Sequence, residues 1–289
     1  MSSFHLIDGG LSTELERLGA KIQGELWTGR ALLDDPDLVL QAHRAFALAG
    51  AEVVISSSYQ LSRQGFLEVG LTEADADEAL RRSIAVAREA VAGTDAKVAA
   101  SIGPYGAVLH DGSEYRGDYT VSQAQLEDFH ATRLAVLLEE SPDFLAIETI
   151  PNLVEARALA QVLKGIETPK WFSFTAGSAD LLWSGEKIED AVAEIAGLSN
   201  LVAVGVNCVN PEFVAEIAGR IKPLVAAQII AYPNRGGTWD SANGVWLGNK
   251  PREFASWLPE WQAAGVSWVG GCCGTNSLDI TTLSAALAN

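Results

Sequence analysis

The chain has 289 residues, 48% of them hydrophobic, and a formal net charge of −17 from 37 acidic and 20 basic side chains. A chain this acidic would repel a phosphate backbone, which argues against nucleic acid as a partner. The sequence has no run of about 18 apolar residues and no basic segment followed by an apolar one at its N-terminus, so we expect neither a membrane span nor a secretory signal.

Eight apolar runs with the length of buried strands recur along the chain. They lie at residues 4–7, 52–55, 97–102, 144–147, 171–175, 201–208, 224–230 and 267–269. Helical patterns separate them, at 14–18, 36–50, 72–91, 122–140, from 151, at 188–196, from 211, at 251–264 and from 277. The expected helix caps include Ser12 or Thr13, Thr72, Ser122 and Ser277. Apolar strands that alternate with helices indicate a parallel sheet covered on both faces.

Eight strand–helix units predict an α/β fold, a single (β/α)8 TIM barrel that forms one domain over residues 1–289. An open, doubly wound sheet would need two domains or extra strands, and the sequence shows no linker or compositional break. In a barrel, the C-terminal ends of the strands meet at the active face. Residues that directly follow the strands are therefore the candidates for chemistry.

All three cysteines of the chain lie at the exits of predicted strands. Cys208 ends the sixth strand, and Cys272 and Cys273 follow the eighth. An odd number of cysteines, two of them adjacent, fits a disulfide scaffold poorly, so we expect reduced thiols in a cytoplasmic protein. Alternate strands contribute to the same layer of a barrel, which lets the thiols converge. Three thiolates suit Zn²⁺, with a fourth position open for catalysis.

Two adjacent cysteines can share one ion only where the chain leaves strand geometry, because consecutive strand residues face opposite sides. Gly270, Gly271 and Gly274 would permit that departure. The alternative is that the three cysteines are inert members of the core, and an adjacent pair is not one of the usual zinc-binding spacings. Their position at two strand exits favours the metal site.

Two carboxylates also lie at strand exits. Asp8 and Glu148 follow the first and fourth strands, and Asn207 stands beside Cys208. A pair of carboxylates across a barrel mouth can bind an ammonium group or act as acid and base. Either residue alone is about as likely to cap a helix or pair with an arginine. Beside a thiolate site, we interpret the pair as holding the amino group of an amino acid, with Asn207 as a further substrate contact.

Aromatic residues are frequent in the loops of the active face. They are Trp27, Tyr59, Tyr105, Tyr115, Tyr119, Trp239 and Trp246. Rings in such loops can pack as a lid over a site or enclose a cation through their faces.

Taken together, five segments resemble the homocysteine S-methyltransferase family. They are Asp8-Gly9-Gly10, Glu148-Thr149 followed by Pro151-Asn152, Gly205-Val206-Asn207-Cys208, Tyr232-Pro233-Asn234 and Gly270-Gly271-Cys272-Cys273. They span nearly the whole chain, in that order. Residues 103–106 and the loop at 110–119 are most similar to the branch that uses S-methylmethionine or S-adenosylmethionine, rather than to the betaine-dependent branch or to cobalamin-dependent methionine synthase.

The resemblance implies an enzyme of methionine biosynthesis that transfers a methyl group from a sulfonium donor to the thiolate of L-homocysteine. It implies that Zn²⁺ is the cofactor and that the three cysteines are its ligands. It further implies that homocysteine is held by Asp8, Gly9, Gly10 and Glu148.

The donor side is less closely specified by the resemblance. Trp27 stands where the betaine-dependent branch has a donor-binding tryptophan, and we take Tyr59 and Tyr105 as further donor contacts. Residues 56–60 read Ser-Ser-Ser-Tyr-Gln, where relatives more often carry Thr-Ala before Ser-Tyr-Gln. This departure would leave the chemistry intact and alter the donor pocket.

Two other functions remain open. A barrel lyase or aldolase would use Asp8 and Glu148 as acid and base, but it would ordinarily need a Schiff-base lysine, and the predicted strand interiors contain none. A non-catalytic zinc or thiol sensor would use the cysteines and leave the carboxylates and aromatic loops without a purpose. The sequence does not decide the preferred donor, whether selenohomocysteine is an acceptor, or the oligomeric state.

Overall fold

The computed structural model describes residues 4–22, 26–236, 238–240, 245–247 and 252–288. Its main sheet has eight strands, all paired in parallel, in the order β1-β10-β7-β6-β5-β4-β3-β2. A bridge between Ile7 and Val53 joins β1 to β2 at the two ends of this order and closes the ring. The predicted (β/α)8 barrel is therefore confirmed. The strands are β1 His5–Leu6, β2 Val53–Ile55, β3 Lys97–Ile102, β4 Phe144–Ile150, β5 Lys170–Phe174, β6 Leu201–Asn207, β7 Gln228–Tyr232 and β10 Val266–Val269.

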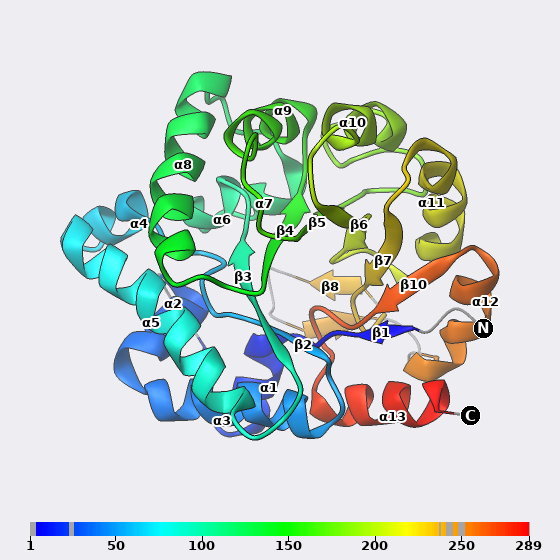
Figure 1. Ribbon diagram of the computed structural model, residues 1–289, viewed down its shortest axis with the longest axis horizontal. Helices are drawn as coiled ribbons and strands as arrows, with labels where there is room; N and C mark the ends of the chain where they lie inside the picture. The colour runs from blue at the N-terminus through cyan, green and yellow to red at the C-terminus, as the bar shows by residue number, and fades with distance from the viewer. Residues whose placement is uncertain (1–3, 23–25, 237, 241–244, 248–251, 289) are drawn as a thin grey trace.

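The helices lie outside the ring of strands (Figure 1). The α-helices are α1 Leu11–Arg17, α2 Trp27–Asp34, α3 Pro36–Leu48, α4 Arg63–Glu68, α5 Glu73–Val91, α6 Gly106–Leu109, α7 Ser113–Arg116, α8 Gln123–Glu139, α9 Leu153–Val162, α10 Ile188–Ile195, α11 Val214–Ile221, α12 Leu258–Ala263 and α13 Ser277–Leu287. Short 3-10 turns lie at η1 Pro211–Phe213, η2 Lys222–Leu224 and η3 Phe254–Trp257. Among the described residues, no helix is long and apolar enough to cross a membrane.

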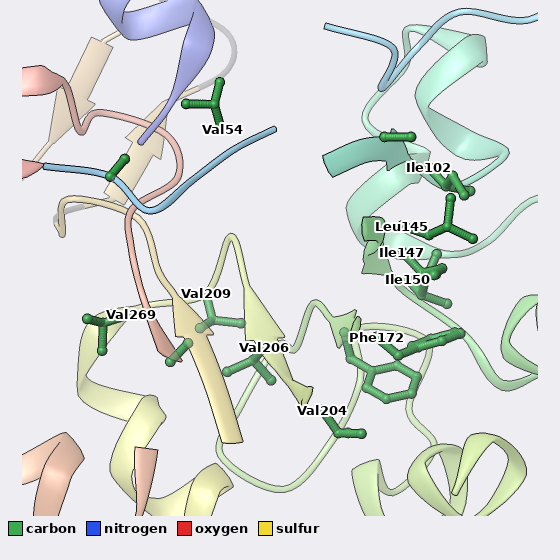
Figure 2. Close-up of a cluster of buried hydrophobic side chains, with 14 of the residues drawn as sticks. Val54, Ile102, Leu145, Ile147, Ile150, Phe172, Val204, Val206, Val209 and Val269 are labelled. Atoms are coloured by element: carbon green, nitrogen blue, oxygen red, sulfur yellow. The ribbon is translucent and has the colours of Figure 1, made fainter. Parts of the chain in front are cut away.

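Alternate strand residues face two separate cores. On β4, Leu145 and Ile147 belong to the core between the strands and the helices, part of which is drawn in Figure 2, whereas Ala146 faces the barrel interior. Small interior side chains such as Ala146 leave room for Trp171 and Trp268, whose ring centroids lie 6.0 Å apart. Burial of each large apolar side chain contributes about 2 kcal/mol. A slip of one residue would turn every side chain of a strand to the opposite face, so the two cores fix the strand register and with it the positions of the strand exits.

The prediction was wrong at the seventh strand, at the helix that follows it and in the loop between them. The seventh strand begins at Gln228 rather than at Leu224, because Lys222–Leu224 forms a 3-10 turn and Val225 and Ala227 pack only partly buried against the outer core. The helix predicted at 251–264 is a 3-10 turn followed by an α-helix from Leu258, and residue 251 lies outside the described residues. The loop after β7 contains a two-stranded antiparallel hairpin, β8 Thr238–Asp240 and β9 Val245–Leu247.

The predicted helix caps are confirmed for two helices and wrong for two others. Thr72 and Ser122 form the predicted caps, each in a reciprocal capping box. The first helix begins earlier than expected, with Gly10 as its N-cap, which leaves the Thr13 hydroxyl available for another contact. Asn276, not Ser277, caps the last helix. The short helices α2, α6 and α7 occupy segments that the sequence predicted as loops, and α4 occupies a segment for which it predicted no element.

Gly205 on β6 permits a close approach of the neighbouring strand. A Cβ atom at this position would lie 1.7 Å from the carbonyl oxygen of Ile230 on β7. We expect Gly205→Ala to lower the free energy of unfolding by about 3 kcal/mol, because the backbone of a packed strand must move. Gly219→Ala is the matched control: this exposed position on α11 has no atom within 4 Å of the added Cβ, so the change should stabilise by about 0.5–1 kcal/mol. Urea unfolding of both variants checks this, and equal midpoints would contradict it.

Candidate active site and metal centre

A cavity opens at the C-terminal ends of the strands. Its lining comes from the C-terminal parts of β2, β3, β4, β6 and β7 and from the segments that follow β1, β2, β3, β6 and β10. The predicted site residues on this lining are Asp8, Gly9, Gly10, Tyr59, Glu148, Asn207, Cys208, Cys272 and Cys273. None of the described lining residues is Lys, Arg or His. The cavity therefore combines acidic, thiol and aromatic groups without a cation of its own.

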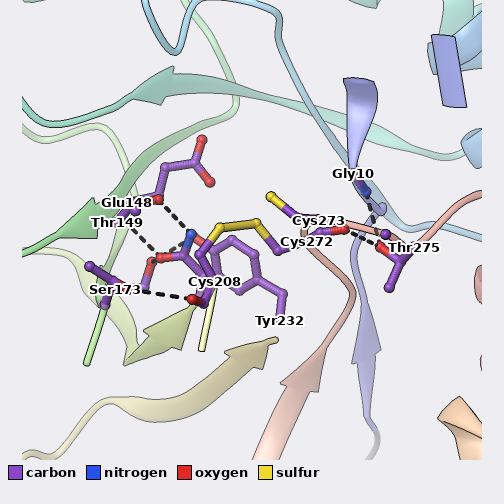
Figure 3. Close-up of a disulfide and its surroundings, with 12 residues drawn as sticks. Gly10, Glu148, Thr149, Ser173, Cys208, Tyr232, Cys272, Cys273 and Thr275 are labelled. Atoms are coloured by element: carbon purple, nitrogen blue, oxygen red, sulfur yellow. Dashed lines mark hydrogen bonds between the residues drawn. A yellow bond between two sulfur atoms is a disulfide. The ribbon is translucent and has the colours of Figure 1, made fainter. Parts of the chain in front are cut away.

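The three cysteine sulfur atoms converge as predicted. All three lie within 4.8 Å of one another, and within the described part of the chain this is the one group of His, Cys, Asp and Glu side chains close enough to share an ion. Cys208 follows β6, and Cys272 and Cys273 follow β10 (Figure 3). The strand ends at Val269, so the adjacent cysteines are released from strand geometry and both sulfur atoms face the same side.

The expectation that all three cysteines are free thiols was wrong. A disulfide joins Cys208 to Cys272, and Cys273 is free (Figure 3). The Cα atoms of the bonded pair lie 5.5 Å apart, within the usual range for a disulfide, so the convergence that suits a metal also allows oxidation. The adjacent cysteines, Cys272 and Cys273, are not bonded to each other. Burial raises the pKa of the Cys273 thiol to about 11, so without a nearby cation this thiol is neutral at pH 7.

The glycines around the cysteines serve close packing more than unusual backbone angles. A Cβ at Gly270 would lie 2.3 Å from Ile7, and one at Gly10 would lie 2.4 Å from the carbonyl oxygen of Cys272. Only Gly274 of this segment adopts a positive φ, +79°. Backbone N–H groups tie the segment to the loop after β1: Gly274 donates to the Thr13 hydroxyl at 3.0 Å. The cysteine loop and the start of α1 are thus one packed unit.

The two predicted carboxylates lie in the cavity lining and both are buried. Asp8 is 3% exposed and accepts a hydrogen bond from the Ile55 N–H at 2.8 Å. Burial raises the pKa of Asp8 well above its usual value. Glu148 is 8% exposed and accepts a hydrogen bond from the Ser101 hydroxyl. Burial raises the pKa of Glu148 to about 7. Two buried carboxyls without a counter-ion in the lining would each be stabilised in the charged form by a cationic ligand.

Asn207 joins the exits of β4, β5 and β6. Its Oδ1 accepts from the Thr149 N–H and the Ser173 hydroxyl, each at 2.7 Å, and its Nδ2 donates to the Thr149 hydroxyl at 2.7 Å. Ser173 continues the network to the Tyr232 hydroxyl at 2.6 Å (Figure 3). Thr149 and Cys208 both adopt positive φ, 62° and 51°, which is costly for residues with side chains. The network thus holds strained backbone beside Glu148 and at a metal-site cysteine.

The aromatic residues predicted on the donor side separate into two groups. Tyr59 lines the cavity, and so does Tyr115, whose hydroxyl lies 4.0 Å from Cys273 Sγ. Tyr105 does not reach the lining: its ring packs on Tyr119 and Phe129, with centroids 5.5 and 5.1 Å away. Trp27 begins α2, and its side chain lies outside the described residues, as do those of Trp239 and Trp246.

Sequence reasoning missed several groups that complete the site. Ser101, Thr149, Ser173 and Tyr232 hold the strand exits, and each lies at or next to the end of a strand, which is the signal that could have identified them. Within the described strands, lysine stands only at first positions, Lys97 on β3 and Lys170 on β5, so the prediction for the strand interiors is not contradicted. Lys170 begins β5, but its amine donates to the carbonyl groups of Ile166 and Ser199 at the opposite end of the barrel. It is therefore not a Schiff-base residue for this cavity.

Comparison with protein-family models assigns nearly the whole chain to one family. The model described as homocysteine S-methyltransferase matches residues 5–287. The homocysteine S-methyltransferase of Escherichia coli K12 is 39% identical over 97% of this chain and 94% of its own length. Homocysteine S-methyltransferase 1 of Arabidopsis thaliana is 38% identical over 98% of this chain and 93% of its own length.

Solved structures agree with this assignment. The metallated form of the homocysteine methyltransferase from E. coli matches with a TM-score of 0.87 at 38% identity, and the match covers 98% of this chain and 96% of that protein. The oxidized form of the same E. coli protein also matches with a TM-score of 0.87, at 37% identity over 98% of this chain and 95% of that protein.

Proposed function

The chain belongs to the homocysteine S-methyltransferase family, and from this premise we propose that it transfers a methyl group from a sulfonium donor to homocysteine, with zinc as its metal. The donor would be S-methylmethionine or S-adenosylmethionine, and the product methionine. The observation that carries this proposal is the cavity itself, in which three cysteine sulfurs and two buried carboxylates meet without a cationic side chain.

The donor set fits a zinc ion. Sulfur atoms bound to one tetrahedral zinc, each at about 2.3 Å, stand about 3.8 Å apart. The sulfurs of Cys208, Cys272 and Cys273 already lie within 4.8 Å, so small side-chain rotations suffice once the Cys208–Cys272 bond is reduced. Reduced cysteines in turn agree with the predicted cytoplasmic location. Zinc bound here would favour the thiolate form of homocysteine, the form that is nucleophilic toward a methyl group.

Homocysteine would be oriented by lining residues of β4 and of the segment after β1. Glu148 and Asp8 are placed to receive its ammonium group, which would supply the counter-ion that both carboxyls lack. Gly9 and Gly10 line the same side of the cavity, and their lack of side chains leaves space for the ligand's backbone atoms. Asn207 Nδ2 donates one of its two hydrogens to the Thr149 hydroxyl. The second hydrogen remains for a bond to the substrate.

A positively charged donor suits the part of the lining that follows β2 and β3. Tyr59 and Tyr115 present aromatic surface there. Glu114, which precedes Tyr115 and does not line the cavity, adds a carboxyl behind them whose pKa is raised by burial to about 7. Sulfonium ions are attracted by such groups, whereas an anionic donor would meet only carboxylates. Tyr105, another predicted donor residue, would support this part of the lining from behind. Transfer joins the methyl group to the homocysteine sulfur, breaks its bond to the sulfonium sulfur and leaves two neutral thioethers.

A competition assay tests this function. Reduced, zinc-loaded protein is incubated with homocysteine and one donor at a time: S-methylmethionine, S-adenosylmethionine, betaine or methyltetrahydrofolate. We expect methionine from the sulfonium donors alone, because betaine carries no sulfonium leaving group and the folate is anionic. Methionine formation from betaine or the folate at a comparable rate would contradict the assignment of the donor class.

A further inference from the structure

Behind the cavity wall formed by Tyr59 and Tyr115, which we call the donor wall, lies a buried cluster of charged and polar groups. It consists of Glu155 on α9 with His130 and Arg133 on α8, all at most 2% exposed. None of them lines the cavity, so the proposed chemistry does not use them directly. Buried charges are costly to retain unless their bonding is well satisfied, and their presence here needs a reason.

Glu155 holds the segment that follows β3. Its Oε1 accepts from the Tyr105 N–H at 2.6 Å and from His130 Nε2 at 2.8 Å, and its Oε2 accepts from the Tyr119 hydroxyl. Asn152, one turn earlier, donates from Nδ2 to the carbonyl of Gly117 at 3.1 Å. Residues 105–119 are therefore fixed near both ends from the start of α9. Tyr115 lies between these two anchored points.

Arg133 holds the other part of the donor wall. One terminal nitrogen of its guanidinium, Nη2, donates to the carbonyls of Ser58 and Tyr59, each at 2.8 Å, and Nη1 donates to the carbonyl of Gly103 at 3.0 Å. The Tyr59 ring lies directly over Gly103, where a Cβ would stand 2.6 Å from the ring. Burial lowers the pKa of Arg133 to about 10, so the guanidinium still carries its charge at pH 7. The exits of β2 and β3 are thus joined through one side chain.

We propose that Glu155 and Arg133 are positioning residues for the methyl donor: they hold the backbone of the donor wall and so set where Tyr59 and Tyr115 meet the donor. This inference rests on the proposed function for the assignment of that wall to the donor. Apart from the bond between Glu155 and His130, the hydrogen bonds of both side chains reach the segments after β2 and β3, and among the described residues none reaches the cysteines or Asp8. Loss of the cluster should therefore affect donor use and leave the metal and homocysteine in place.

Glu155→Gln tests the cluster with little change in volume. An amide has one acceptor oxygen, so it cannot accept from Tyr105, His130 and Tyr119 together. We expect kcat/KM for the sulfonium donor to fall about 10- to 100-fold, because small displacements of a positioning group are costly in rate. Zinc content and the KM for homocysteine should stay at wild-type values. Tyr119→Phe, which removes one hydroxyl only, should cause a smaller loss in the same direction and serves if Glu155→Gln does not fold.

The matched control is Glu139→Gln at the other end of α8. Glu139 forms an exposed pair with Arg81, and we expect wild-type kinetics from this variant. Hydrogen exchange of the backbone amides in residues 103–119 gives a readout that needs no turnover, and Glu155→Gln should speed exchange there but not in β6 or the cysteine loop. Unchanged exchange in 103–119, an unchanged donor kcat/KM, or parallel losses for donor and homocysteine would each overturn the proposal. Failure of the wild-type protein to use any sulfonium donor would instead contradict the proposed function.

Discussion

Replacing Cys273 with alanine should abolish zinc binding and methyl transfer together. The variant keeps two of the three sulfurs that lie within 4.8 Å of one another, too few for the proposed site. Without zinc, the homocysteine thiol has a pKa of about 8.5 and is only about 3% ionised at pH 7. Its sulfur is also no longer positioned by the metal, so we expect the rate of methionine formation to fall at least ~10³-fold. Alanine at Cys208 or Cys272 should have the same effect.

A neighbouring substitution separates loss of the metal from general damage to the cavity. Ser57 lines the same cavity, and its hydroxyl has no hydrogen-bond partner within the described part of the chain. Ser57→Ala should therefore retain its zinc. Metal analysis of each purified, reduced variant, followed by the methionine assay, checks the expectation. Full activity in metal-free Cys273→Ala protein would show that the thiol cluster is not the catalytic metal site.

Replacing Glu148 should chiefly weaken homocysteine binding. A charge-assisted bond to an ammonium group contributes about 1.5–3 kcal/mol, so Glu148→Ala should raise the KM for homocysteine on the order of 10- to 100-fold while zinc stays bound. Glu148→Gln keeps the volume and the bond from Ser101, and separates the effect of charge from that of size. Loss of zinc with an unchanged KM would mean that Glu148 supports the metal site instead.

The pH dependence of the same pair gives a second readout. Burial raises the pKa of Glu148 to about 7 in the free protein, so its charged form, the form that binds an ammonium group, declines as pH falls through 7. The ratio of kcat/KM for homocysteine between wild type and Glu148→Gln should therefore shrink below pH 7. Taking the ratio removes the pH dependence of the homocysteine thiol, which both proteins share.

The barrel could be predicted from sequence because each strand is a nearly continuous apolar run, as parallel strands buried on both faces must be. The run at 224–230 misled for the same reason: Val225 and Ala227 are apolar and pack against the outer core, but they precede the strand, which begins at Gln228. Short helices such as α7 are set by tertiary contacts, with Gly106 packed against the backbone of Glu114, and carry no periodic signal.

The site could be predicted as far as the strand exits fix it. Glu148 lies in the last part of β4, Asp8 and the three cysteines follow strands, and the barrel brings them into one cavity. Two features lay beyond the sequence. The place of Tyr115 opposite Cys273 depends on how residues 105–119 are held by α9, and the Cys208–Cys272 bond depends on the redox state of the protein, which composition does not encode.

The central claim is that the three cysteines bind the zinc ion on which methyl transfer depends. The most direct measurement is the initial rate of methionine formation by reduced wild-type protein as a function of its zinc content, from chelator-stripped protein to one equivalent restored. The account predicts a rate proportional to bound zinc, near zero in the stripped protein and complete at one ion per chain. A rate that is independent of zinc content would contradict it.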